Sequence, residues 1–478
     1  MNIKLISRYI GVALLFNAAF MALSMVVSML YNFDESLSPL LLSTIITSLV
    51  GVFPLIFVKK EGVLNLKEGF AITVFTWVLS FIFGMLPYLL FGGPFSLSNA
   101  WFESVSGYTT TGSTILTDIE SLPKGLLFWR YSTHYIGGIG VMIFMLMVLP
   151  TMSAFQLRKI EISSLSKDNY RYRTREMLRV ITYTYIGITL LTFISLLLAG
   201  MPAFDAIGHS MTIVSTGGFS NRNLSIASYN SPAIERVCIL FMYLSSLHFG
   251  LMYATVVNKS KMLIRSGVFR YYTSFLILFS LAVAIDLMFN GGYTSWELAL
   301  RRAIFQVVSM ATTTGLATAD TNTWPLFSIL ALGIAMLHGG CSGSTSGGVK
   351  ADRIWIFFKS LRSELTRMLH PTAYVQVKVG KNSIDHGTVS NALLFIVTFF
   401  FTSLVVTLVL LFGGLDFTEA LSASVASLSN SGPGYGECGS LGSFAAFSSF
   451  EKLLLTIEMF LGRVEIFALL VFFKIFQK

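Results

Sequence analysis

The sequence of 478 residues has little charge: Asp, Glu, Lys and Arg make up 12% of it, whereas 54% of its residues are hydrophobic. An ordinary soluble domain carries about 25% charged residues, so this composition excludes that class. Apolar runs long enough to cross a bilayer recur along the chain, for example at 5–30, 40–58, 70–91, 178–198 and 453–473. The sequence therefore predicts a polytopic helical membrane protein.

Cysteine is also scarce, and the three cysteines are far apart in the chain: Cys238, Cys341 and Cys438. They give neither a disulfide framework nor the spacing of metal ligands. The six histidines are scattered in the same way, and no paired carboxylates or nucleophile with its base converge in the sequence. These absences predict a protein that is not an enzyme and holds no resident metal.

A nucleotide-binding loop is missing too. The segment GGCSGSTSGGVK at 339–350 has the glycine spacing of a Walker A loop, but Val349 stands where that motif requires lysine. The segment GGIG at 137–140 lacks the third glycine of a dinucleotide fingerprint and indicates close helix packing. We therefore expect no nucleotide cofactor in this chain, and any nucleotide dependence must come from another chain.

Basic residues gather in three connections between the apolar runs. They are Arg158, Lys159, Lys167, Arg171, Arg173, Arg175 and Arg179 in the first, Lys259, Lys261, Arg265 and Arg270 in the second, and Lys350, Arg353, Lys359, Arg362, Arg367, Lys378 and Lys381 in the third. By the positive-inside rule these connections are cytoplasmic, and so are both termini, which carry Lys4, Arg8, Lys474 and Lys478. The net charge of +9 therefore reflects membrane topology and predicts no nucleic-acid partner.

An internal repeat follows two N-terminal spans at 1–60. Four units, at 61–157, 158–262, 263–380 and 381–478, each contain an apolar helix, a short half-helix, a polar turn with glycine and a second apolar helix. The half-helices are too short to span a membrane, and they begin near Ser98, Ala203, Trp296 and Phe417. This pattern predicts ten spans around one pore, with the second helix of the third unit, which begins near Leu326, interrupted at 339–350.

The four polar turns are TTTGST at 109–114, VSTGGFS at 214–220, TTTGLAT at 312–318 and SNSGPGYG at 429–436. Non-helical backbone at membrane depth is tolerated where it is buried in protein or lines a watery cavity, and its carbonyl groups can replace a cation's hydration shell. One such turn alone indicates an ordinary helix contact, but four at similar spacing predict a cation filter. Aligned on one glycine in each turn, the predicted filter residues are Thr110, Thr111, Gly112, Ser215, Thr216, Gly217, Thr313, Thr314, Gly315, Asn430, Ser431 and Gly432.

These turns, together with 339–350 and with EMFLGRVEIFALL at 458–470, resemble the Trk/Ktr/HKT superfamily of cation uptake proteins. The two extra N-terminal spans favour the TrkH-type potassium-translocating subunits within it. The resemblance implies a homodimer with one pore per protomer, in the inner (plasma) membrane of a bacterium, and a cytoplasmic TrkA-type regulatory protein that binds a nucleotide, ATP/ADP or NAD. The basic loops would contact that protein or anionic lipid, and charge does not choose between them.

The resemblance also places an intramembrane gate below the filter. The expected gate residues are Gly339, Gly340, Cys341, Ser342, Gly343, Ser344, Thr345, Ser346, Gly347, Gly348, Lys350 and Arg463. Arg463 lies near the middle of the last apolar run, where a charge costs about 2.5–3.5 kcal/mol on insertion scales and therefore faces the protein interior or water. The alternatives are an ordinary helix break for the loop, and a structural ion pair of Arg463 with Glu458 or Glu465.

Potassium translocation through this filter is the predicted function. Position 112 carries glycine where sodium-favouring plant members of the superfamily have serine, which favours potassium. A secondary transporter coupled to H⁺ or Na⁺ is an alternative, and it would need acidic or histidine groups at broken helices. Acidic residues deep in the apolar runs are few: Glu103, Glu458 and Glu465. The other alternative is a sodium-permeable member of the same superfamily.

Overall fold

The computed structural model describes residues 2–59, 65–153, 174–257, 259, 261–372, 375–379 and 382–476. Within these residues the chain is almost entirely helical, and its only strands are the short antiparallel pair β1 (Lys378–Val379) and β2 (Asn382–Ser383). The prediction of an all-α membrane protein is therefore confirmed. Several basic residues of the expected inner loops lie outside the described residues: Arg158, Lys159, Lys167, Arg171, Arg173, Lys381 and Lys478.

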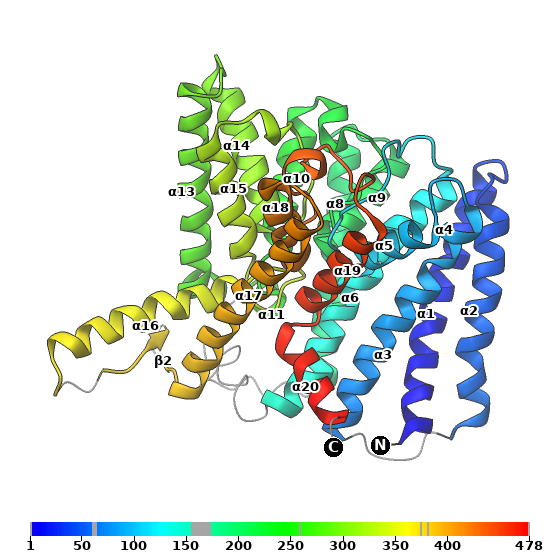
Figure 1. Ribbon diagram of the computed structural model, residues 1–478, viewed down its shortest axis with the longest axis horizontal. Helices are drawn as coiled ribbons and strands as arrows, with labels where there is room; N and C mark the ends of the chain where they lie inside the picture. The colour runs from blue at the N-terminus through cyan, green and yellow to red at the C-terminus, as the bar shows by residue number, and fades with distance from the viewer. Residues whose placement is uncertain are drawn as a thin grey trace.

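The first two helices form an antiparallel pair at one side of the molecule (Figure 1): α1 (Ile3–Leu30) and α2 (Leu37–Phe57). The turn between them is held by the Asp34 carboxylate, which accepts hydrogen bonds from the hydroxyls of Ser28 and Ser36 and from the backbone N–H of Gly125. Of the most apolar stretch of 18 residues in α2, only 22% is buried within the protein. Such a helix is unfavourable in water but fits a bilayer, where lipid covers its outer face.

Four units follow, and each contains a long first helix, a half-helix and a second helix in that order. The first contains α3 (Leu66–Gly84), α4 (Leu86–Phe91), α5 (Leu97–Tyr108) and α6 (Lys124–Ser153). The second contains α8 (Thr174–Leu198), α9 (Ala203–Ser215), η1 (Ser225–Tyr229), α10 (Pro232–Ser245), α11 (Phe249–Val256) and α12 (Met262–Arg265). The third contains α13 (Gly267–Phe289), α14 (Trp296–Ala311), η2 (Thr321–Thr323), α15 (Leu326–His338) and α16 (Ala351–Leu369). The fourth contains α17 (His386–Phe412), α18 (Phe417–Ser429), η3 (Gly436–Cys438), α19 (Ser449–Arg463) and α20 (Ile466–Phe476).

The half-helices are α5, α9, α14 and α18, and three of them begin at the residue that the sequence predicts. The fourth, α5, begins one residue earlier, because Ser96 caps it by accepting a hydrogen bond from the backbone N–H of Asn99. The expected unit boundaries at 60/61, 157/158 and 380/381 lie outside the described residues, and the boundary at 262/263 falls in the short helix α12.

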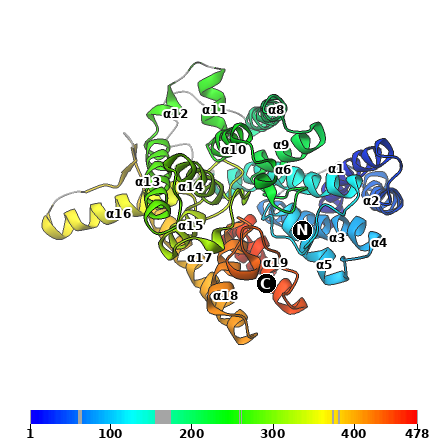
Figure 2. The same cartoon turned by 90° about the horizontal axis from the view of Figure 1, so that it is seen from above.

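The four units follow one another around a central axis (Figure 2). Each half-helix packs against the second helix of the preceding unit: α9 on α6, α14 on α10 and α18 on α15. The half-helix of the first unit, α5, packs in the same way on α19 of the fourth unit, which closes the circle. The start of α1 and the end of α20 lie on one face of the molecule, and the half-helices enter from the opposite face (Figure 1).

The count of ten spans stays a prediction, because hydropathy identifies only part of them among the described residues; α6 is a further continuous helix of 30 residues. Six helices among the described residues are long and apolar enough to cross a membrane: α1, α2, the run Lys67–Phe91, and helices within α8, α13 and α17. In the second unit, α10 and α11 are bent by 104° at Ser246–His248, and together they give a seventh candidate. In the fourth unit, α19 ends at Arg463 and α20 begins at Ile466.

The second helix is therefore broken in the second, third and fourth units. The predicted break in the third unit is present, and the other two breaks were not predicted. The reason for these two breaks is local chemistry. Polar residues stand at the bend of the second unit, and in the fourth unit Glu465 adopts a left-handed backbone conformation with φ of 62° that helices exclude.

Candidate functional site

The four polar turns have the same backbone conformation. One residue in each turn, Thr110, Thr216, Thr313 or Asn430, has a left-handed φ of 52°, 55°, 56° or 54°. The backbone N–H of the next residue donates to the carbonyl five residues earlier, as from Thr111 to Ser106 and from Gly217 to Thr212. The third and fourth turns repeat this hydrogen bond at Thr314 and Ser431. Each half-helix thus ends in the same tight turn, which exposes its last carbonyl groups.

Glycine follows at the next position of every turn. Gly112, Gly218, Gly315 and Gly432 have φ values of 85°, 88°, 74° and 95°, which residues with a Cβ rarely adopt. The sequence alignment on Gly217 was therefore wrong by one residue in the second turn. The equivalent residues there are Thr216, Gly217 and Gly218, and Ser215 belongs to the end of α9.

The turns are in contact around a closed ring. A Cβ added to Gly112 would lie against the carbonyl oxygen of Gly217, and one added to Gly218 would lie against that of Thr314. In the same way Gly315 faces the carbonyl oxygen of Ser431. Gly432 faces that of Thr111, so the fourth turn returns to the first. Each of these approaches is too close for a side chain, so glycine is required by the neighbouring turn as well as by its own φ.

Hydroxyl groups tie three of the turns together internally. The side chains of Thr109 and Thr111 are hydrogen-bonded at 2.8 Å, those of Thr312 and Thr314 at 2.7 Å, and those of Ser429 and Ser431 at 3.1 Å. The second turn cannot form this pair, because Gly217 takes the position of the second hydroxyl. The ring is therefore fourfold in its backbone and uneven in its side chains.

A buried ion pair holds the first and second turns together. Arg130 of α6 lies 2.8 Å from the carboxylate of Glu103 in α5, and both side chains are fully enclosed. Glu103 also accepts from the backbone N–H of Ile115, just beyond the first turn. Arg130 donates to the carbonyl of Ser220 and lies 4.1 Å from the centre of the Phe219 ring, both at the end of the second turn. Arg130 was not among the predicted site residues, although an arginine inside an apolar helix is a signal visible in the sequence.

The segment 339–350 lies directly beneath the ring and contacts the ends of three half-helices. The hydroxyl of Thr345 donates to the carbonyl of Val214 at 2.9 Å, at the end of α9. The backbone N–H of Gly347 donates to the side chain of Thr313 at 2.7 Å. That of Gly348 donates to the carbonyl of Ser429 at 2.9 Å, at the end of α18. The segment interrupts the helix after His338, as expected, and it is buried rather than at a surface.

Arg463 connects this segment to the first unit. Its guanidinium donates to the carbonyl of Thr345 at 2.7 Å and to the carbonyl of Gly137 in α6 at 3.3 Å. The alternative of an ion pair between Arg463 and a glutamate is not what the structure shows. Glu465 pairs instead with Arg353 at 2.8 Å, and Glu458 accepts from the hydroxyl of Ser424 at 2.8 Å. The break after α19 turns Glu465 away from the helix face that Glu458 occupies, which the unbroken helix of the sequence analysis did not allow.

The other predicted gate residues pack around these contacts. Cys341 donates its backbone N–H to the carbonyl of Ser246 at the bend between α10 and α11, and Gly340 approaches the same residue closely. The hydroxyls of Ser344 and Ser346 are hydrogen-bonded to each other at 2.7 Å. Lys350 is buried, and its ammonium group donates to the carbonyl of Ser346. The structure thus brings the whole predicted set together below the ring.

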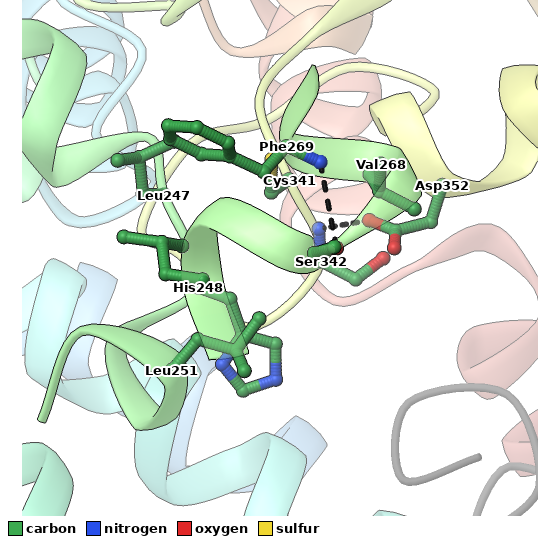
Figure 3. Close-up of a pocket in the computed structure, with 10 residues that line it drawn as sticks. Leu247, His248, Leu251, Val268, Phe269, Cys341, Ser342 and Asp352 are labelled. Carbon is green, nitrogen blue, oxygen red and sulfur yellow. Dashed lines mark hydrogen bonds between the residues drawn. The ribbon is translucent and has the colours of Figure 1, made fainter. Parts of the chain in front are cut away.

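A small pocket lies behind the segment, where it meets the bend in the second unit (Figure 3). Leu247 and His248 line it from the bend, and Cys341 and Ser342 line it from the segment. The Asp352 carboxylate accepts a hydrogen bond of 2.6 Å from the backbone N–H of Ser342. The bend and the segment therefore form one packed unit, and the bend is a further part of the site that the sequence analysis missed.

The arrangement can favour a cation at the ring and oppose one beneath it. Four half-helices converge with their C-terminal ends on the turns, and such ends carry partial negative charge. Below them Arg463, Lys350 and Arg353 line one small cavity together with Glu465. No group of three or more His, Cys, Asp or Glu side chains in the described part of the chain could hold a metal ion.

These features define a class. The protein is a multi-pass membrane protein with four related units around one axis, in which four backbone turns form a ring and buried basic side chains lie beneath it. The TrkH family model, described as cation transport protein, matches residues 40–478. The chain therefore belongs to the TrkH family of cation transport proteins, as the resemblance predicts. It is a transporter, which confirms the expectation that it is not an enzyme.

Individual relatives match over nearly their whole length. The chain is 35% identical to the Trk system potassium uptake protein TrkH of Salmonella typhimurium, over 87% of this chain and 86% of that protein. It is 32% identical to the protein of the same name from Halomonas elongata, over 99% and 98%. The crystal structure of the potassium transporter TrkH from Vibrio parahaemolyticus superimposes with a TM-score of 0.90 at 31% identity, over 98% of both chains.

Proposed function

We propose that the protein takes up potassium through the ring of four turns, which acts as its selectivity filter. The observation that carries this proposal is the closed ring itself. Each turn places a glycine against the carbonyl oxygen of the next turn, from Gly112 and Gly217 around to Gly432 and Thr111. The names of the relatives, which are potassium uptake proteins, support potassium as the transported ion.

The physical reason lies in the cost of dehydrating a cation. A potassium ion that enters the ring loses its hydration shell, and backbone carbonyl oxygens must replace it. The four half-helix ends add a negative potential at the same point. In the corrected register the filter residues are Thr110, Thr111, Gly112, Thr216, Gly217, Gly218, Thr313, Thr314, Gly315, Asn430, Ser431 and Gly432.

The segment 339–350 and Arg463 form the gate in this proposal. Hydrogen bonds to Val214, Thr313 and Ser429 hold the segment under the filter, where it blocks the path. Arg463 adds a positive charge at the same level and bridges the segment to α6. Opening requires that the segment move away, so these hydrogen bonds set the cost of opening.

The assembly is part of the proposal as well. We expect a homodimer in the inner membrane of a bacterium, with both termini in the cytoplasm and a TrkA-type nucleotide-binding protein on that side. The start of α1 and the end of α20 lie on the same face of the molecule, which supports this topology. Arg265, Arg362 and Arg367 belong to connections on the face that would meet the regulatory protein or anionic lipid.

The test is potassium uptake in bacterial cells that lack their own potassium uptake systems. Cells that produce the chain together with a TrkA-type partner should grow at low potassium and accumulate potassium. A matched control is Gly187→Ala, because a Cβ at this glycine of α8 would meet no other atom. Growth that depends on added sodium, or uptake of sodium instead of potassium, would contradict the proposal.

One observation favours coupled transport as a second candidate. Glu458 is fully enclosed, and its second carboxylate oxygen has no hydrogen-bond partner among the described residues. A buried carboxyl group of this kind can exchange a proton during transport. Coupling predicts that a proton gradient drives potassium accumulation against its own gradient in vesicles, and that Glu458→Gln abolishes this effect. A passive channel shows no such drive.

A further inference from the structure

A cavity of about 380 Å³ lies between α1, α3 and α6. Val12 and Phe16 of α1 line it and are 54% and 42% exposed, so the cavity opens at the outer surface of the helices. On α3 its lining includes Ile72 and Trp77. In a membrane the medium at this opening is lipid.

The chemistry of the cavity suits an apolar occupant. Two of its polar side chains are hydrogen-bonded to each other: the amide of Asn17 donates to the hydroxyl of Ser80 at 2.9 Å. A third, Thr73, donates to the carbonyl of Gly69 in its own helix. Apolar cavities of more than about 150 Å³ in proteins stay free of water and take apolar molecules. An empty cavity of this size would forfeit the dispersion contacts of its walls.

The length of the cavity matches one acyl chain. Along α1 it extends from Tyr9 to Asn17, and along α3 from Ile72 to Ser80. Eight residues of a helix rise by about 12 Å. One leaflet of a bilayer has a hydrocarbon depth of about 15 Å. A chain that enters at the level of Tyr9 and Ile72 would therefore fill the cavity within one leaflet.

Positive charge marks the end at which a headgroup would lie. Lys4 and Lys67 are exposed in the first turns of α1 and α3, each five residues before the first lining residue of its helix. The neighbouring carboxylate of Glu68 accepts hydrogen bonds from the backbone N–H groups of Asn2 and Asn65 and stays ionised, so it offsets one of the two lysine charges. The guanidinium of Arg8 donates hydrogen bonds to backbone carbonyls at the end of α2. The two ammonium groups still leave this end positive, and they are thus complementary to a negatively charged headgroup.

The inner end of the cavity reaches the proposed filter and gate. Tyr108 lines it and directly precedes the first turn of the ring. Gly137 lines it too, and the carbonyl of Gly137 accepts the hydrogen bond from Arg463. An occupant would therefore pack against the wall that carries the first filter turn and the partner of the gate arginine.

We propose that this cavity binds one acyl chain of an anionic phospholipid, from the leaflet on the side of the termini, and that the bound chain supports transport by ordering the wall formed by Tyr108 and Gly137. The second clause rests on the proposed function. The first clause does not, because binding is measured without transport.

Binding is tested with the full chain in phosphatidylcholine vesicles that contain phosphatidylglycerol with a photoreactive acyl chain. We expect labels on α1 between Tyr9 and Asn17 and on α3 between Ile72 and Ser80. Ala13→Phe fills the cavity and should lower this labelling about tenfold, which corresponds to about 1.4 kcal/mol. Ala19→Phe is the matched control, because Ala19 is exposed on the same helix outside the lining, and it should leave the labelling unchanged.

A second variant protects the test against misfolding of the first. Gly140→Leu fills the cavity from α6, where an added Cβ meets only the Trp77 ring at 3.5 Å and 3.7 Å. Equal labelling in the native chain and in both filled variants would overturn the proposal. Unlabelled phosphatidylglycerol should compete with the probe better than phosphatidylcholine does, and Lys4→Gln with Lys67→Gln should remove that preference. Oleate that competes as well as phosphatidylglycerol would overturn the assignment to a phospholipid.

Transport is tested separately in the same vesicles, with the TrkA-type partner present. Potassium flux through the native chain should rise severalfold when phosphatidylglycerol is added, and flux through Ala13→Phe should not respond. Labelling that follows the pattern above without any potassium flux would leave the lipid site standing and reject the proposed function. A flux response that Ala13→Phe retains in full would reject the regulatory clause.

Discussion

Gly432 of the fourth turn faces the carbonyl oxygen of Thr111 in the first turn, although 320 positions separate the two residues in the printed sequence. This contact closes the ring, because the three other contacts join turns that follow each other along the chain. Asn430 adds a hydrogen bond of 3.0 Å from its side-chain amide to the hydroxyl of Thr111. The first and last units therefore depend on each other, and the ring is complete only in the whole chain.

The first prediction tests the register of the second turn. Gly218→Ser adds a Cβ where φ is 88° and where the carbonyl of Thr314 leaves no room. We expect this variant to lose preference for potassium over sodium, as Gly112→Ser should. The measurement is potassium uptake with increasing sodium as competitor.

The control for this register is Gly315→Ser in the third turn, where φ is 74° and the carbonyl of Ser431 is the close neighbour. All three substitutions should change selectivity in the same direction, because their positions are equivalent. A Gly218→Ser variant with native selectivity, beside altered Gly112→Ser and Gly315→Ser variants, would show that the second turn has another register.

The second prediction concerns the ion pair of Glu103 and Arg130. Removing one partner of a buried pair strands the other charge and typically costs about 3–5 kcal/mol. We expect Glu103→Gln to lower the thermal unfolding temperature clearly and to reduce potassium flux, because the pair holds the first two turns. Arg222→Gln is a suitable control, since that ion pair with Asp205 is partly exposed.

The double variant Glu103→Gln with Arg130→Met separates charge from geometry. It leaves no stranded charge, so part of the lost stability should return, while flux should stay low because the turns remain unsupported. An unchanged unfolding temperature in Glu103→Gln would mean that the pair contributes nothing to the fold.

The third prediction tests the attachment of the gate segment. Thr345→Val keeps the size of the side chain and removes the hydroxyl, whose single proton is shared between the carbonyls of Val214 and Ser245. A hydrogen bond contributes about 0.5–1.5 kcal/mol, so its loss should favour the open state about two- to tenfold. We expect higher flux without the regulatory partner, measured in vesicles that contain the chain alone.

Ser342→Ala is the control for that experiment. It leaves the backbone N–H that binds Asp352, and the hydrogen bonds of Thr345 remain in place. Its flux should match the native chain. Flux that rises equally in both variants would indicate general loosening of the segment and not the loss of a specific attachment.

The sequence predicted the half-helices and their turns well because both depend on local chemistry. Each half-helix is a short apolar stretch that is followed by Thr or Ser and then by Gly. This pattern predicted the first residue of every half-helix to within one residue of the observed one. The register of the second turn was wrong because Gly217 and Gly218 are the same residue type, and only φ separates them. A pattern of letters cannot distinguish two adjacent glycines.

The breaks in the second and fourth units were missed for a different reason. Ser246 is held by the backbone N–H of Cys341, which belongs to another unit, and Glu465 is held by Arg353 of the third unit. Such partners lie about a hundred positions away in the printed sequence. Hydropathy records only neighbours along the chain, so an apolar run at 453–473 was read as one continuous helix.

The last prediction separates charge from structural support at Arg463. Its guanidinium binds the carbonyls of Thr345 and Gly137, and no carboxylate lies within ion-pair distance among the described residues. Arg463→Ala therefore strands no buried acid, and we expect the unfolding temperature to change little. Potassium flux should rise, because both the bridge to the gate segment and the repulsion of cations are lost.

Arg463→Lys completes the comparison. Lysine keeps the positive charge, but its compact ammonium group cannot reproduce the planar fork that reaches two carbonyls at once. If charge is the main barrier, flux through Arg463→Lys stays near the native rate. If the bridge is the main barrier, flux rises nearly as far as in Arg463→Ala. Native flux in both variants, at unchanged stability, would remove Arg463 from the gate, because neither its charge nor its hydrogen bonds would then oppose the passage of potassium.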